Sequence, residues 1–148
     1  MSEDNKRLED FLDQAAKRKV EREEEEQRRV EGPRRFKDTF LAVAASKIRP
    51  VLDTACEPWL KRGLPAGVDV DDVSSSPSVT LMVEPHPQLR GELVYTGQID
   101  DRKILAYRHF GPGAGEPIGQ FGLNDITRDL VQKHVDDFIA EVVRLGGR

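Results

Sequence analysis

The chain has 148 residues, of which 37% are apolar and 34% are charged, and its formal net charge is −4. This length suits one compact domain with an appendage, and the acidic balance disfavours non-specific nucleic-acid binding because phosphate backbones are negative as well. The single cysteine excludes an internal disulfide, and no Cys/His framework for zinc is present. We therefore predict neither a cofactor nor a metal.

The first ten residues, MSEDNKRLED, are charged where a signal peptide needs an apolar segment. The longest apolar run, FLAVAA, is far shorter than a membrane span. We expect a cytoplasmic protein without a membrane-spanning segment.

The first predicted element is a helix over residues 4–31. Its apolar side chains recur at helical spacing and share one face: Leu8, Phe11, Leu12 and Ala15. An apolar stripe that has no core of its own either finds a partner or stays exposed. We predict that these four residues bind another protein or a second copy of the chain.

The second half of this helix has no apolar residue between Glu21 and Arg29, a run that reads EREEEEQRR. Glu24 and Glu25 each precede an arginine by four residues, a spacing that supports a helix by about 0.3–0.5 kcal/mol per pair. Such a segment is marginal alone. A solvated helical extension or a disordered tail is therefore the competing interpretation.

Gly32 and Pro33 are expected to separate this charged helical extension, residues 1–33, from a globular domain, residues 34–148. A second helix is predicted over residues 34–60. Its apolar residues cover nearly half of its circumference, which is typical of a helix lying on a core: Phe36, Phe40, Val43, Ala44, Ile48, Val51, Leu52, Ala55 and Trp59. Pro50 should kink or divide it, and Cys56, on the same face, is interpreted as a core residue.

Residues 63–78, GLPAGVDVDDVSSSPS, have the composition of a connecting loop. Alternating apolar residues then predict strands at 78–84, 92–99 and 103–110. A shorter β-like segment, IGQFGL, follows at 118–123. We expect an antiparallel meander of roughly four strands.

The glycine-rich stretch RHFGPGAGEPIGQFG, residues 108–122, is interpreted as a hairpin connection. A phosphate-binding loop would open directly into a helix and carry a Lys-Ser/Thr pair, and this stretch does neither. The last predicted element is a helix over 125–145, capped by Asn124 or Asp125 and packed on the sheet. The predicted fold class is α+β.

Few residues suggest catalysis. The triplet DRK at 101–103 matches the acidic-x-Lys half of a metal-dependent nuclease core, and Glu84 or Glu92 lies upstream. In such a core the carboxylates, with Asp101, would hold Mg²⁺ while Lys103 orients the attacking water. This short match supports only an alternative hypothesis, a small nuclease-like enzyme. The leading hypothesis is a non-enzymatic interaction or assembly module that docks or self-associates through its N-terminal helix.

Overall fold

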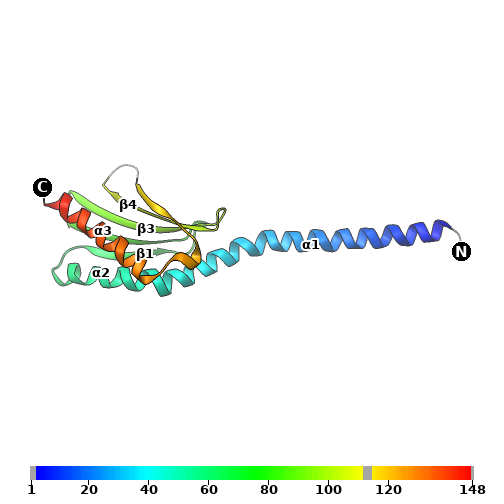
Figure 1. Ribbon diagram of the computed structural model, residues 1–148, viewed down its shortest axis with the longest axis horizontal. Coiled ribbons are helices and arrows are strands. Elements are labelled where there is room, and N and C mark those ends of the chain that lie inside the picture. Colours follow the sequence, from blue (N-terminus) through cyan, green and yellow to red (C-terminus); the bar gives the residue numbers. More distant parts are fainter. Residues whose placement is uncertain (1–2, 112–114, 148) are drawn as a thin grey trace. The chain divides into compact units, whose positions relative to one another are not determined.

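The computed structural model describes residues 3–111 and 115–147 (Figure 1). The chain divides into two compact units, Met1–Arg35 and Phe36–Arg148. The described residues form helices α1 to α3 and one antiparallel sheet. The predicted α+β class is confirmed, with five strands in the sheet rather than four.

Helix α1 (Glu3–Val43) continues through Pro33, so the predicted end at Gly32 and Pro33 was wrong. A proline inside a helix removes one backbone hydrogen bond, but the turns around it are rich in Glu and Arg, which favour the helix. One ion pair spans the proline, with the Arg35 Nη2 3.3 Å from the Glu31 Oε2. The last residues of α1 belong to the second unit, where Phe36 and Phe40 are buried.

A π-helical turn, η1 (Ala44–Ile48), joins α1 to helix α2 (Arg49–Lys61). Pro50 lies in the first turn of α2, where its missing N–H needs no helical partner. The helical run continues through the predicted kink or division at Pro50, and the helix type changes from π to α just before it. The predicted core face is buried at most of its positions: Phe36, Phe40, Ala44, Ile48, Val51, Leu52 and Cys56.

The sheet is an antiparallel meander in which each strand pairs with the next along the chain. Its strands are β1 (Ala66–Asp71), β2 (Ser78–His86), β3 (Leu89–Gln98), β4 (Lys103–Phe110) and β5 (Glu116–Phe121). Strands β2, β3 and β4 occupy segments that the alternating pattern predicted, and β5 overlaps the β-like segment predicted at 118–123.

Strand β1 corrects the prediction of a loop over residues 63–78. It pairs with β2 in a register that sets Val68 beside Leu81 and Val70 beside Val79. Both valines are half-buried and pack against the core, which explains why a segment rich in Gly and Asp is extended. The true loop is the shorter stretch after Asp71.

The β4–β5 connection begins at Gly111, whose φ of +89° is open to glycine at little cost. The hairpin interpretation agrees with the strands on both sides, although residues 112–114 lie outside the described part of the chain. Helix α3 (Arg128–Gly146) follows a 3-10 turn, η2 (Leu123–Asp125). Its cap is Thr127, whose Oγ1 accepts from the Leu130 N–H at 3.1 Å, so the predicted Asn124 or Asp125 cap was wrong.

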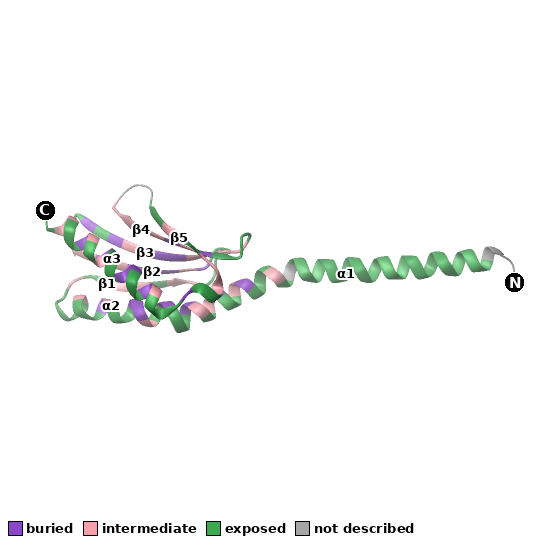
Figure 2. Cartoon of the chain, viewed as in Figure 1, coloured by how far each residue is buried: buried purple, intermediate pink, exposed green. Residues whose placement is uncertain are grey.

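One face of the sheet carries the core of the second unit. Helix α2 packs on β1 and β2, α3 packs on β3, and the two helices contact each other. Figure 2 shows the buried positions gathered between these layers. The alternate residues of the strands point to the opposite face. That outer face carries Thr80, Met82, Glu92, Val94, Leu105 and Tyr107.

Candidate protein-interaction site

The first unit presents the predicted apolar residues to solvent. Leu8 is 56% exposed, Phe11 67% and Leu12 55%, and Ala15 is exposed as well. At 3.6 residues per turn these four side chains fall within an arc of about 100°. We call this set the α1 stripe. Figure 2 shows the surrounding length of α1 as exposed.

Charged residues border the α1 stripe differently on its two sides. From the same helical geometry, Arg7 and Arg18 lie along one edge, and Glu9 and Asp13 lie along the other. An apolar centre with a charged rim is the usual anatomy of a protein interface. The α1 stripe is therefore bordered by positive charge on one edge and by negative charge on the other. This difference would orient a bound partner.

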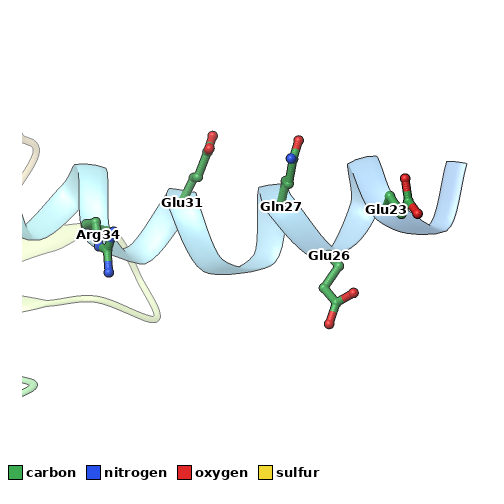
Figure 3. Close-up of a pocket in the computed structure, with 5 residues that line it drawn as sticks. All are labelled: Glu23, Glu26, Gln27, Glu31 and Arg34. Carbon is green, nitrogen blue, oxygen red and sulfur yellow. The ribbon is translucent and has the colours of Figure 1, made fainter. Parts of the chain in front are cut away.

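Beyond the stripe, α1 carries charged side chains supported by local ion pairs, such as the Arg28 Nη2 and Glu24 Oε2 at 4.0 Å. A shallow hollow is lined by five side chains of this same helix, from Glu23 to Arg34. In Figure 3, Gln27 and Glu31 point to one side of the helix and Glu26 to the opposite side. These groups do not converge on a common point, so we infer no ligand site there.

The residues of the nuclease alternative lie at two ends of the sheet. Glu92 pairs with His109 near one end of the β3–β4 hairpin, whereas Lys103 pairs with Gln98 at the other end. Six residues of extended strand separate the two pairs, about 20 Å at 3.3 Å per residue. Asp101 lies in the turn beside Lys103, and Glu84 lies on β2 toward the end that holds Glu92. The fold does not gather these four side chains.

Cys56 and His134 have structural surroundings. Cys56 is buried, and burial followed by the negative charge of Asp53 raises the pKa of its thiol, which keeps it protonated and a poor nucleophile. His134 is buried on α3, and its Nδ1 lies 2.7 Å from the Tyr95 hydroxyl on β3. Burial lowers the pKa of His134 and raises that of Tyr95, so both groups are neutral in this bond. The pair ties the helix to the sheet.

A second candidate surface was not predicted from the sequence. An open groove of about 320 Å³ lies between α2 and α3. Apolar groups line most of it: Ala55, Pro58 and Trp59 from α2, and Val135 and Ile139 from α3. Asp136 stands on the α3 wall, and its carboxylate accepts a hydrogen bond from the Gln132 amide at 2.9 Å.

A smaller hollow of about 160 Å³ shares Pro58 and Trp59 with this groove and is also lined by Arg62 and Leu64. The Arg62 Nη1 donates to the Pro58 carbonyl at 2.8 Å, which fixes a positive charge at this end. We call the two hollows together the α2–α3 groove. The sequence placed Trp59 on a core face, but the structure leaves it half-buried. A tryptophan beside a proline near the end of a helix was the one available signal.

Comparison of the chain with protein-family models, curated proteins and solved structures gives no match. Among residues 3–111 and 115–147, no three His, Cys, Asp or Glu side chains are placed to hold a metal ion together. In the same part of the chain, no helix combines the length and the apolar composition that crossing a bilayer requires.

Proposed function

We propose that this chain is a non-enzymatic interaction or assembly module that docks onto a protein partner through the α1 stripe. The observation that carries the proposal is the exposure of Leu8, Phe11 and Leu12, each more than half accessible on one side of a helix. Solitary apolar side chains on a surface need no explanation, but a contiguous patch marks a binding surface.

The free energy gained by burying the α1 stripe limits the kind of partner that can bind it. Fully burying a Leu or Phe side chain contributes about 1.5–3 kcal/mol, and these three are half to two thirds exposed in the free chain. Their burial would thus supply roughly 3–5 kcal/mol. Association costs at least about 4 kcal/mol in lost freedom. The partner must therefore add apolar surface of its own, as a preformed groove does.

The test replaces Leu8, Phe11 and Leu12 together with Ser in the full chain. We expect loss of partner binding and of assembly, measured by sedimentation and by capture from native lysate. Far-UV circular dichroism and urea unfolding should show the second unit folded as before. The matched control is Val20→Ser, since Val20 is 52% exposed on the same helix but lies about 120° around it from Leu8. Unchanged binding by the triple variant would contradict the proposal.

A further inference from the structure

We propose that the α2–α3 groove of one copy of this chain binds the α1 stripe of a second copy. The inference rests on the proposed function and names the partner. Each copy presents both halves of the contact: an exposed apolar helix face and an apolar groove between two helices.

The spacing of the α1 stripe fits a groove. Residues 8, 11, 12 and 15 stand at i, i+3, i+4 and i+7, the pattern by which an amphipathic helix anchors in a hydrophobic groove. Ala55, Trp59 and Ile139 are partly exposed in the α2–α3 groove and offer the apolar surface that the stripe lacks. Its volume of about 320 Å³ corresponds to roughly ten water molecules, room for inserted side chains of the size of Phe11.

Pairing of two α1 helices with each other is disfavoured by charge. In a parallel pair the seam after Ala15 would continue through Lys19 and Arg22, which would face their own copies. In an antiparallel pair centred on the stripe, like edges meet, so Arg7 of one copy would approach Arg18 of the other. Two turns of apolar seam are also short for a coiled coil.

The rim of the α2–α3 groove complements the edges of the stripe. Asp136 lines the groove on α3 and can face the edge that carries Arg7 and Arg18, while Arg62 on α2 can pair with the acidic edge that carries Glu9. The outer face of the sheet offers a poorer match, because its apolar residues are mixed with polar ones such as Thr80 and Glu92, and Val94 at its centre is only 6% exposed. Charge and shape together select the groove.

A single contact between two different surfaces leaves one free stripe and one free groove in the pair. These can engage each other in a reciprocal dimer or bind further copies in rings or filaments. In every case the stripe of one copy needs the groove of another, and this gives the experiment its design.

The experiment uses two full-length variants. The stripe variant carries Leu8→Ser, Phe11→Ser and Leu12→Ser; the groove variant carries Ala55→Arg, which fills the groove, and Trp59→Phe. We expect concentration-dependent dimers or larger species for the unaltered chain in sedimentation velocity. Each variant alone should associate at least about a hundredfold more weakly. An equimolar mixture should form a 1:1 heterodimer and nothing larger, since it contains one intact stripe and one intact groove.

The mixture also carries its own reporter. Trp59 is the single tryptophan of the chain, so in the mixture tryptophan emission comes only from the stripe variant, at its intact groove. Docking should shift the emission to shorter wavelength as apolar side chains cover the indole. Val20→Ser and Leu60→Ser are controls, because both residues are exposed and apolar but outside the two surfaces. Both controls should assemble as the unaltered chain does.

A milder variant keeps the test usable if Ala55→Arg fails to fold. Asp136→Lys, at an exposed position, should weaken association about two- to fivefold, and Arg7→Glu with Arg18→Glu in the other copy should restore it. The inference is overturned if the unaltered chain stays monomeric, if the groove variant assembles normally, or if the mixture shows neither heterodimer nor emission shift. Loss of lysate partners by the stripe variant beside a monomeric unaltered chain would leave the proposed function standing without this inference.

Discussion

Phe11 and Phe40 both belong to α1, yet the helix around each of them is stabilised in a different way. Phe11, in the first unit, is 67% exposed, whereas Phe40, in the second, is fully buried. The helix around Phe11 is supported by local propensity and i, i+4 ion pairs. The helix around Phe40 is supported by burial against the sheet. One continuous element thus combines a segment with exposed apolar side chains and a segment whose apolar side chains belong to the core.

The strongest test of this contrast replaces each phenylalanine with Ala. Phe40→Ala should lower the free energy of unfolding by about 3–5 kcal/mol, because it leaves a cavity in the core. Phe11→Ala should change it by less than about 0.5 kcal/mol, as exposed positions do. Urea unfolding followed by circular dichroism measures both. Equal costs would show that the two regions do not differ as described.

Two Gly→Ala substitutions, one in each unit, are expected to change stability in opposite directions. A Cβ at Gly91 would lie 3.0 Å from the Phe138 Cζ and 3.1 Å from the Val142 Cγ2, both fully buried, so Gly91→Ala should destabilise the second unit by about 1–3 kcal/mol. Gly32→Ala should instead favour the helix of the first unit by up to about 1 kcal/mol. Urea unfolding reports the first change and hydrogen exchange of residues 20–40 the second. A neutral Gly91→Ala would mean that the packing there can yield.

Removing the hydrogen bond between Tyr95 and His134 measures how much a satisfied buried polar pair contributes to the stability of the second unit. Tyr95→Phe removes the hydroxyl and leaves the His134 Nδ1 without that partner, which should cost about 1–3 kcal/mol in urea unfolding. Tyr107→Phe, at a half-buried tyrosine on the outer face, is the matched control and should cost less. Equal effects would argue against a role for the bond.

The same histidine predicts a pH dependence confined to the second unit. Burial lowers the pKa of His134 in the folded chain, while nearby Asp137 raises it and Lys133 lowers it less strongly. Below the ordinary pKa of 6.5 the unfolded chain therefore binds the extra proton. Stability should fall as the pH drops from 7 toward 5, and this slope should flatten in His134→Gln. An unchanged slope in the variant would assign the effect to other groups.

Salt should give the smallest difference between the units. The exposed ion pairs of α1, each supporting a helix by about 0.3–0.5 kcal/mol, weaken when salt screens them. Raising the salt from 0.05 to about 0.5 M should speed amide exchange in residues 20–35 and leave the buried strands of the second unit unaffected. Equal acceleration in both would contradict a local origin of helix stability in α1.

Periodic apolar patterns were enough to predict most elements of this fold. The wide face from Phe36 to Trp59 and the alternation in β2, β3 and β4 depend on short-range order, which sequence displays directly. Strand β1 was missed because its core-facing side consists only of Ala66, Val68 and Val70, within a segment of turn-forming residues.

The errors at helix ends have a similar cause. Asn124, Asp125 and Thr127 lie within four positions, and each is a residue type that caps helices. Asn124 and Asp125 belong to a 3-10 turn, so α3 begins after them, with Thr127 as its cap. The α1 stripe could be predicted because its members are neighbours in sequence. The α2–α3 groove could not, because Ala55 and Ile139 meet only through the packing of two helices on the sheet.

The sheet has two edge strands, β1 and β5, and each has a feature that discourages pairing with a further strand. Strand β5 at one edge carries Pro117, which lacks the N–H needed to extend a ladder, and its pairing with β4 is interrupted by a bulge at Ala106 and Tyr107. Strand β1 at the other edge carries Asp69, whose exposed charge repels a like edge. Further strands are thus discouraged from adding on either side. An assembly of the kind proposed above would therefore consist of native units joined by side chains, without the cross-β order of amyloid.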